Sequence, residues 1–457
     1  MNKRFIIPSL LIGISLCTLA AQLPQPTPPR TFPHHDAPRA TREPIPDYQP
    51  EFEPGDPRIA KAKHRIHNIR DYGAKGDGFS HLLSDEFKDQ ASIDQRYGPG
   101  RYRLDDESDY VAIMEGIRYA KAAANETRAR SVRGLPSLYI PQGIYQINRT
   151  IPLVDISGFT ISGDGKRQTV LRFTGKEEAL FGIERSSTLA FEKFEVISTL
   201  GTGTTAFLIA DVLAKYPDRP TYHFDWTSVS FTQFDVGVKT TGWAMTDSTN
   251  FLHCRFNSCG TALLLDNHQS MGHHFQNCYF GFGSQHLGKL KENSYPVVFH
   301  VKQGGNITVS GGYIIIHDGT TLLLEPRNEK LSFSPINWST GLFNFYGVKW
   351  EQVRKNHPVL FDAVDDGKFS AKVNFDNCLV YQRTKAEGAS LGALHPGMNV
   401  SLRNVGVNKN QAYIQEVSSA SDRARRASIV FDHVSGIRFN AASTPVHAVE
   451  WRGPTPL

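Results

Sequence analysis

Three apolar residues at positions i, i+3 and i+5 form a pattern that recurs nine times along the chain. It first occurs as Phe191, Phe194 and Val196, and successive triplets are 30 residues apart on average. This spacing does not follow the 3.6-residue period of a helix, but it suits two short strands that meet at a bend. Repetition at this interval is typical of stacked coils that bury one another's faces. The other triplets are Trp226/Val229/Phe231, Phe251/Cys254/Phe256, Phe275/Cys278/Phe280, Val309/Gly312/Ile314, Phe345/Val348/Trp350, Phe375/Cys378/Val380, Leu402/Val405/Val407 and Phe431/Val434/Gly436.

Between these triplets lies a second pattern, a short apolar run that ends in a charged residue. The charged residues, in chain order, are Glu184, Asp211, Lys239, Asp266, Lys302, Glu325 and Asp362. If the coils stack about 4.8 Å apart, these side chains form a single column on one outer face of the solenoid. The column has two interpretations: a ladder of exposed ion pairs, each worth little, or a surface that binds a substrate.

The N-terminal part of the chain has a different pattern. Residues 68–78 predict a short strand that runs into a glycine-rich turn, and no Gly-Lys-Ser/Thr of a phosphate loop follows. Tyr110 and Ile117 belong to an apolar series at helical spacing, which predicts an amphipathic helix over 106–124. Residues 138–147 and 158–165 then predict strands separated by turns.

Residues 68–78, this helix, Tyr139–Tyr145 and the turn at 161–165 together resemble the opening of the pectate lyase superfamily. That superfamily includes polysaccharide lyases, glycoside hydrolases and phage tailspike depolymerases. The resemblance implies an all-β, right-handed, single-stranded parallel β-helix with an N-terminal α-helical cap, and activity on a polysaccharide. One departure is an insertion at 79–104, which we interpret either as a loop over the substrate groove or as a segment without a role.

The chain begins with a segment typical of a secretory signal peptide. Lys3 and Arg4 precede an apolar run of about a dozen residues, and Ala20 and Ala21 follow it. We assign residues 1–21 to this peptide. The protein is therefore expected to be secreted or periplasmic, with association to the cell surface left open.

The rest of the chain divides into a linker and one folded domain. Residues 22–65 are the linker, because positions 22–57 hold 11 prolines. The β-helix domain, 66–457, consists of a cap with the insertion at 66–134, coils at 135–440 and a C-terminal end at 441–457.

The composition excludes several classes of protein. With 40% hydrophobic residues the chain is not globally disordered. Its net charge is +5, and it becomes smaller when Lys3 and Arg4 are removed with the signal peptide. A charge of this size is too small to indicate nucleic-acid binding. Five cysteines exclude a disulfide scaffold, and Cys254 and Cys278 share a repeat position that predicts burial. After the signal peptide no apolar run is long enough to span a membrane.

The centre of the charged column holds residues that suit the cleavage of an acidic polysaccharide. A lyase must neutralise the uronate carboxylate, remove the adjacent proton with a base and protonate the leaving oxygen. A Lys close to another cation has a lowered pKa and can act as the base, and a His can carry a proton at neutral pH. The residues predicted to be catalytic are Lys302, Asp266, Lys239, His268 and His273.

Further residues of the coils are predicted to bind the substrate. They are Glu184, Asp211, Arg255, Lys289, Tyr313 and Glu325. A Ca²⁺ ion held by carboxylates is a second way to neutralise the sugar, but we assign no metal-binding residues and no certain cofactor. Whether the chain forms a homo-oligomer is left open by the sequence.

Three alternatives to a lyase stay open. A glycoside hydrolase needs two carboxylates that flank the bond, and Asp266 and Glu325 would lie roughly 9–10 Å apart, just beyond the inverting range. A C5 epimerase shares the proton-abstraction step of the lyase. The last alternative is a non-catalytic protein, either a carbohydrate-binding or a surface structural β-helix.

Overall fold

The structure is a computed structural model of the chain. It describes residues 66–453, except for 129–136, 212–220, 243–245, 268, 283–294, 326–339, 353–357, 365–369, 383–388, 409–411, 418–426 and 442–447. The predicted signal peptide and linker lie outside the described residues, as do the predicted site residues His268 and Lys289.

The described strands form three long sheets, which we call sheets I, II and III. Sheet I has 13 strands, in spatial order β1 (Ile66–Asn68), β2 (Ser137–Ile140), β5 (Ser157–Gly163), β8 (Ser187–Glu192), β11 (Tyr222–Thr227), β14 (Thr249–Leu252), β17 (His273–Gln276), β20 (Ile307–Ser310), β23 (Thr340–Tyr346), β26 (Ser370–Asp376), β29 (Met398–Arg403), β32 (Ser428–Asp432) and β34 (Ala448–Arg452). Sheet II has 10 strands, β3 (Gly143–Ile147), β6 (Thr169–Phe173), β9 (Glu195–Ser198), β12 (Ser230–Thr232), β15 (Arg255–Asn257), β18 (Tyr279–Phe282), β21 (Tyr313–Ile316), β24 (Lys349–Gln352), β27 (Leu379–Gln382) and β30 (Gly406–Asn408). Sheet III has 11 strands, β4 (Ile151–Val154), β7 (Ala179–Glu184), β10 (Thr205–Asp211), β13 (Val236–Gly242), β16 (Thr261–Asn267), β19 (Val297–Gln303), β22 (Thr320–Leu324), β25 (Phe361–Ala363), β28 (Ser390–Leu394), β31 (Ala412–Glu416) and β33 (Ile437–Asn440).

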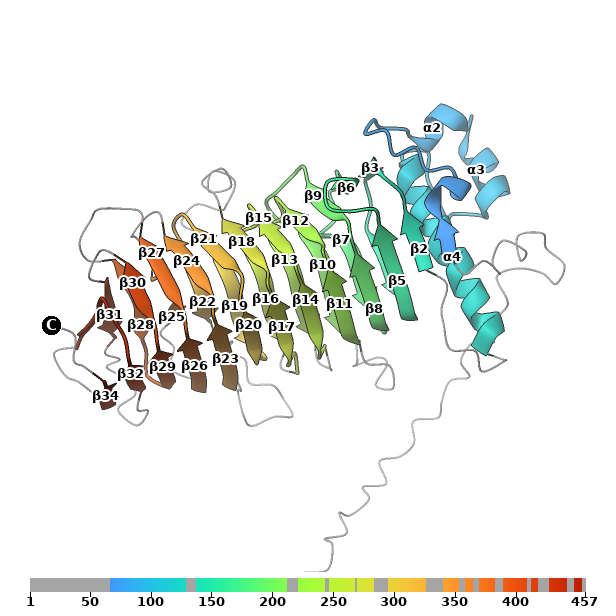
Figure 1. Cartoon of the computed structure of the whole chain (residues 1–457). Coiled ribbons are helices and arrows are strands. Elements are labelled where there is room, and N and C mark those ends of the chain that lie inside the picture. Colours follow the sequence, from blue (N-terminus) through green and yellow to red (C-terminus); the bar gives the residue numbers. More distant parts are fainter. Residues whose placement is uncertain are drawn as a thin grey trace, which may run out of the picture. The chain divides into compact units, whose positions relative to one another are not determined.

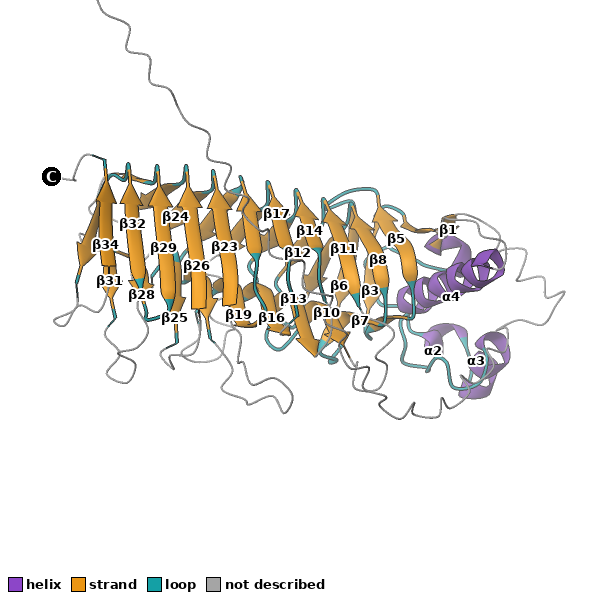
Figure 2. Cartoon of the chain, turned by 90° about the horizontal axis from the view of Figure 1, so that it is seen from below, coloured by secondary structure: helices purple, strands orange, loops and turns teal. Residues whose placement is uncertain are grey.

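From β2 to β31, each coil contributes one strand to each sheet. The chain passes from β5 in sheet I to β6 in sheet II and β7 in sheet III, and then returns to sheet I with β8. Strands that are neighbours within a sheet run parallel, as β5 and β8 do. The chain is therefore a right-handed, single-stranded parallel β-helix, as the resemblance implied (Figures 1 and 2).

The apolar triplets mark the bend between sheet I and sheet II. In every triplet the residue at i+2 has a left-handed backbone, with φ between 51° and 65°. This residue turns the chain so that the side chains at i, i+3 and i+5 all point inward, which an extended strand would not allow. Asparagine and glycine tolerate this conformation best. The nine residues at i+2 are Lys193, Ser228, His253, Asn277, Gly311, Gly347, Asn377, Asn404 and His433.

Equivalent inward side chains stack on one another along the core. The ring centroids of Phe251 and Phe275 are 4.3 Å apart, and those of Trp226 and Phe251 are 4.6 Å apart. Stacked rings of this kind add to the free energy gained by burying their area. The predicted core residues Cys254, Phe256, Cys278 and Phe280 are at most 1% exposed, which confirms their inward position.

Four helical segments lie at the N-terminal end of the coils: η1 (Ile69–Tyr72), α2 (Leu83–Glu86), α3 (Gln90–Tyr97) and α4 (Ser108–Arg128). Helix α4 packs against β2 and β3 and buries Tyr110, Ile113 and Ile117. It confirms the predicted helix, with bounds shifted from 106–124. Within the described ranges, no helix is both long and apolar enough to cross a lipid bilayer.

The insertion at 79–104 belongs to this cap. It contains α2 and α3, whose side chains Leu83 and Ile93 are buried in the core. The backbone amide of Leu83 donates to the carbonyl of Asp106, just before α4. Figure 1 shows α2 and α3 beside α4, so these two helices enlarge the cap rather than lie over the coils.

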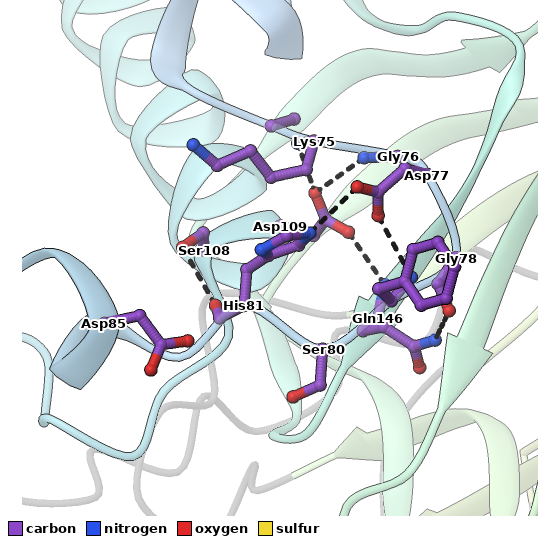
Figure 3. A network of polar contacts seen from close by, with 12 residues as sticks. Lys75, Gly76, Asp77, Gly78, Ser80, His81, Asp85, Ser108, Asp109 and Gln146 are labelled. Carbon is purple, nitrogen blue, oxygen red and sulfur yellow. Dashed lines mark hydrogen bonds and ion pairs between the residues drawn. The ribbon is translucent and has the colours of Figure 1, made fainter.

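A buried carboxylate fixes the glycine-rich turn onto the cap. Asp109 accepts hydrogen bonds from the backbone amides of Lys75 (2.6 Å), Gly76 (3.1 Å) and Gln146 (2.9 Å), as Figure 3 shows. Gly76 has φ of +60°, and a Cβ atom there would lie 2.5 Å from the ring of Tyr145. The turn therefore needs glycine for a structural reason, in agreement with the absence of a phosphate-loop signature.

Candidate functional site

The predicted charged column lies on sheet III, but it is not a single column. Glu184 ends β7, Lys239 lies within β13, Lys302 lies in β19 and Glu325 directly follows β22. Lys239 pairs with Leu264, whereas the residue two positions later along β13 pairs with Asp266. The register therefore places Lys239 two residues earlier than Asp266, in a second row on the same face. Asp362 lies in that second row as well, because it pairs with Leu323, which in turn pairs with His300.

The strand pairing also separates Asp266 from Lys302. The register between β16 and β19 shifts after Leu265, so that Asp266 pairs with Gln303. Asp266 is only 7% exposed, in contrast to the more exposed Lys302. The expected direct stacking of Lys239, Asp266 and Lys302 is therefore wrong, because an irregularity and a two-residue offset intervene.

A histidine, a lysine and a glutamate meet across β19 and β22. The Oε2 atom of Glu325 lies 2.5 Å from Nε2 of His300 and 3.5 Å from Nζ of Lys302. His300 and Lys302 are two residues apart on one strand, so both project from its outer face. The hydrogen bond from His300 lowers the pKa of Glu325, and the charges of His300 and Lys302 lower it further. Glu325 is therefore ionised at neutral pH and contacts both the imidazole of His300 and the ammonium group of Lys302.

A second carboxylate–histidine pair lies on the next two coils. Oδ1 of Asp362, in β25, is 3.0 Å from Nε2 of His395, which follows β28. His395 is 5% exposed, so this pair lies deeper than the first. Asp362 belongs to the charged series that the sequence predicted, whereas His395 does not.

Tyr295, just before β19, lies close to both pairs. Burial raises its pKa, and the charges of Asp362 and Glu325 raise it further. The phenol therefore keeps its proton at neutral pH and can donate it. We call Tyr295, His300, Lys302, Glu325, Asp362 and His395 the sheet III cluster.

The cluster combines groups that can act in acid–base chemistry. An ionised Glu325 that accepts a hydrogen bond from Nε2 of His300 fixes the imidazole tautomer, so that Nδ1 is the atom able to accept a proton. Lys302 adds a positive charge beside it, and Tyr295 adds a protonated hydroxyl. Together these residues offer a base, an acid and a cation within two neighbouring coils.

Other predicted residues of sheet III lie away from the cluster. Nζ of Lys239 lies 2.6 Å from Oε1 of Glu178, and Glu184 lies 3.7 Å from Nη1 of Arg185. Asp211 ends β10, and its side chain is not among those described. These positions line the same sheet toward the cap, where they remain predicted contacts for a bound chain.

Arg255 and Tyr313 lie on a different face, the outside of sheet II. The guanidinium of Arg255 is 4.7 Å from the ring centroid of Tyr279, which stacks on Tyr313 at 6.4 Å. The hydroxyl of Tyr313 donates to Glu351. The structure therefore brings these two predicted residues close to each other, but not to the sheet III cluster.

His273 lies inside the coils and is fully buried. Its Nδ1 is 2.7 Å from the hydroxyl of Thr249, and its Nε2 is 3.1 Å from that of Ser270. Burial lowers its pKa to about 4. A residue in this position does not contact a polysaccharide on the outer face, so the predicted proton transfer by His273 does not fit the structure.

The prediction of catalytic residues from sequence missed Tyr295, His300 and His395. The signal for His300 was present, because it precedes Lys302 by two residues in a strand and must share its outer face. His395 had no comparable signal, since it reaches Asp362 only through the pairing of separate coils. Among the described residues, no group of three or more His, Cys, Asp or Glu side chains could hold a metal ion.

No family model matches the chain, and no curated protein matches it significantly. Among solved structures, it is similar to the tailspike protein gp49 from Pseudomonas phage LKA1, with 13% identity, a TM-score of 0.43 and coverage of 80% of each chain. It is also similar to the A-module of the mannuronan C-5 epimerase AlgE6 from Azotobacter vinelandii, with 13% identity, a TM-score of 0.42 and coverage of 85% and 97%. A third is the catalytic unit of a thermostable GH87 alpha-1,3-glucanase from Streptomyces thermodiastaticus strain HF3-3, with 13% identity, a TM-score of 0.41 and coverage of 84% and 67%.

Proposed function

We propose that the protein binds an acidic polysaccharide along the outer face of sheet III and cleaves it by β-elimination at the sheet III cluster. The observation that carries this proposal is the contact of Glu325 with both His300 and Lys302. It joins a proton acceptor to a positive charge on a partly exposed face, and β-elimination from a uronate needs both.

Each step of the elimination has a residue suited to it. Lys302 neutralises the sugar carboxylate, which makes the neighbouring C5 proton more acidic. Nδ1 of His300 removes that proton, while Glu325 stabilises the imidazolium that forms. Tyr295 donates its proton to the glycosidic oxygen as the C4–O bond breaks and the C4–C5 double bond forms.

Residues toward the cap extend the binding surface. Lys239 lies on β13, two strands from β19, which is roughly 10 Å along the solenoid axis. A cation at this distance can contact the carboxylate of a neighbouring sugar. Binding energy from such contacts helps to hold the reacting sugar against the cluster.

The positions of the two carboxylates favour inverting hydrolysis as a second candidate. Leu323 pairs with Asp362, so Glu325 lies two residues beyond Asp362 on the neighbouring strand. The two Cα atoms are then about 8 Å apart on one face of the sheet. Their side chains can therefore bring the two carboxyl groups to the roughly 6.5–9.5 Å at which one activates a water molecule and the other donates a proton. The lowered pKa of Glu325 does not suit it for the acid role, so this reaction requires Asp362 to be the acid.

A product assay on a panel of uronate-containing and neutral polysaccharides tests the proposal. Release of oligosaccharides with the ultraviolet absorbance of a C4–C5 double bond would support the lyase. New reducing ends without that absorbance would identify a hydrolase, and an altered uronate configuration by NMR would identify a C5 epimerase. Binding without any product would leave a non-catalytic carbohydrate-binding protein.

Export of the protein is proposed separately, on the N-terminal sequence. Residues 1–21 have the charge and apolar run of a signal peptide. N-terminal sequencing of the protein from a culture medium or a periplasmic fraction would test this. A chain that still begins at Met1 in the cytosol would contradict it.

A further inference from the structure

The insertion at 79–104 builds a cleft in the cap, away from the sheet III cluster. The cleft has a volume of about 510 Å³. One wall is the turn from η1 to Lys75, the other is α2 with α3, and the floor is one face of α4. Its volume is within the usual range for sites that take a small organic molecule.

The floor of the cleft is a fixed polar and aromatic surface. Glu115, 5% exposed, accepts a hydrogen bond of 2.8 Å from the hydroxyl of Tyr102 and one of 3.1 Å from Nε of Arg118. The guanidinium of Arg118 lies 5.0 Å from the ring centroid of Tyr119, and Tyr119 stacks on Tyr72 at 5.1 Å. Because these side chains hold one another, little ordering is needed when a ligand binds.

The walls are held in place as well. The amide of Lys75 donates to the buried Asp109, which is the network drawn in Figure 3. From there the Lys75 side chain reaches across to Glu86 on α2, with Nζ 2.8 Å from Oε1. On α3, the guanidinium of Arg96 lies 5.5 Å from the ring of Tyr97.

The charges around the cleft are nearly balanced, and this limits the class of ligand. The lining holds four cations, Arg70, Lys75, Arg96 and Arg118, against three carboxylates, Asp71, Glu86 and Glu115. Lys75 is paired with Glu86 and Arg118 with Glu115, so half of these cations already face a carboxylate. A site for a multiply charged phosphate gathers cations without matching carboxylates. The lining instead alternates aromatic rings with guanidinium and carboxylate groups. Sugars match such a lining, because their C–H faces pack on rings and their hydroxyls pair with planar charged groups.

We propose that this cap cleft binds a short oligosaccharide of two or three units, either neutral or with one carboxylate. Tyr97 supplies a ring for stacking, and Arg96 at the rim supplies hydrogen bonds. The cleft lies at the N-terminal end of the coils, whereas the sheet III cluster begins at β19, five strands after β4 and about 25 Å further along the axis. The inference therefore goes beyond the proposed function and does not require catalysis.

Calorimetric titration of the full chain with di- and trisaccharides of uronate-containing and neutral polymers tests this cleft. We expect Arg96→Ala and Tyr97→Ala each to weaken binding of the best oligosaccharide by about tenfold or more. Tyr97→Phe keeps the ring and is expected to bind like the unmodified chain. Tyr381→Ala is the matched control, because this tyrosine is 40% exposed on the outside of sheet II.

Two further measurements keep the result unambiguous. Arg96 is an exposed side chain, so Arg96→Ala should retain the melting temperature even if Tyr97→Ala loosens α3. Lys302→Ala separates this site from the proposed active site: binding in the cleft should persist while any turnover is lost. Absence of oligosaccharide binding, or binding that neither Arg96→Ala nor Tyr97→Ala weakens, would overturn the inference. Binding that depends on Arg96 without any product would support it and reject the lyase.

Discussion

Nε2 of His300 lies 2.5 Å from Oε2 of Glu325, so that a carboxylate after one strand orients an imidazole on the strand beside it. The register allows this contact, because Val301 pairs with Leu324, which places Lys302 beside Glu325, directly after β22. His300 lies two residues before Lys302 on the same face of β19, so one carboxylate can reach both side chains. Substitution of Glu325 is therefore the most direct test of the proposed site.

Replacing Glu325 with Gln should lower turnover by at least about a hundredfold, which is the low end of typical acid–base contributions. The amide keeps the shape of the side chain but removes the negative charge that stabilises a protonated His300. Steady-state kinetics on the best polysaccharide of the panel would measure this. Glu450→Gln is a matched control, since it also removes a carboxylate from an exposed ion pair, on β34. Equal turnover in the two variants would place the reaction elsewhere.

The pH dependence of the Glu325 interaction follows from its lowered pKa. Because the folded-state pKa is below the usual value of 4.5, the carboxylate stabilises the fold at pH values above 4.5. That contribution is lost as the pH falls through the lowered pKa. The difference in melting temperature between the unmodified chain and Glu325→Gln should therefore shrink as the pH falls below about 4.5. A difference that keeps growing below that pH would contradict the assigned ion pair.

Lys302 and Lys239 should differ in the kinetic parameter that each controls. Lys302→Ala is expected to reduce kcat by at least about a hundredfold, with a nearly unchanged melting temperature, because it removes the cation beside the reacting sugar. Lys239→Ala should mainly raise KM, since Lys239 would contact only a neighbouring sugar. Kinetics of both variants on one substrate would show the split. A fall in kcat for Lys239→Ala alone would move the site toward the cap.

His273 should make the fold less stable in mild acid. Its pKa is about 4 in the folded chain, against 6.5 for an ordinary histidine, so the unfolded chain takes up the proton first. Stability is therefore lost as the pH falls from 6.5 to 4, by about 3 kcal/mol in total, and levels off below that. Urea unfolding of His273→Gln at several pH values would test this. The variant is expected to lack this part of the pH dependence, although it is less stable at pH 7.

Phe251 should be among the most sensitive positions of the core. It lies between Trp226 and Phe275 in one stack, with centroid distances of 4.6 and 4.3 Å. Phe251→Ala is expected to cost about 3–5 kcal/mol of unfolding free energy, because a cavity forms between two coils. Denaturant unfolding beside the exposed control Tyr381→Ala would measure it. A loss of less than about 1 kcal/mol would show that the neighbouring coils close the gap.

The fold could be predicted because the same local bend of the backbone repeats along the chain. The i, i+3, i+5 spacing results from a left-handed residue at i+2, and the sequence places Asn or Gly there in five of the nine bends, for example Asn277 and Gly311. Both residues adopt that backbone at low cost. The cap helix was equally clear from its apolar spacing. These features depend on neighbours in sequence, so they can be recognised without knowing which coil packs on which.

The site was harder to predict, because it depends on the register between coils. Loops of unequal length join the strands, and no local signal shows that Lys239 pairs with Leu264 rather than with Asp266. The irregularity after Leu265 then moves Lys302 out of line with Asp266. His395 reaches Asp362 only after two coils are stacked. A shift of two residues is enough to change which charges meet.

The insertion illustrates the same limit. Its sequence left open whether residues 79–104 form a loop over the substrate groove or a segment without a role. The decisive contacts join segments that are distant in sequence, since Leu83 and Ile93 enter the core while Lys75 bonds to Glu86. The cleft is therefore formed by tertiary packing, and no sequence motif predicts it.

Because a left-handed residue recurs at the same place in nine bends, the length of the solenoid can change by whole coils. Deleting residues 254–277 would join His253 directly to Cys278, and both would keep their places in the repeat. The chain would be one coil shorter, and the span from the cap to the sheet III cluster would fall by about 4.8 Å. This span can therefore change only by whole coils of about 4.8 Å each. If one sugar chain were bound at the cap and at the sheet III cluster together, each coil added or removed would change which of its sugar units contacts the cluster.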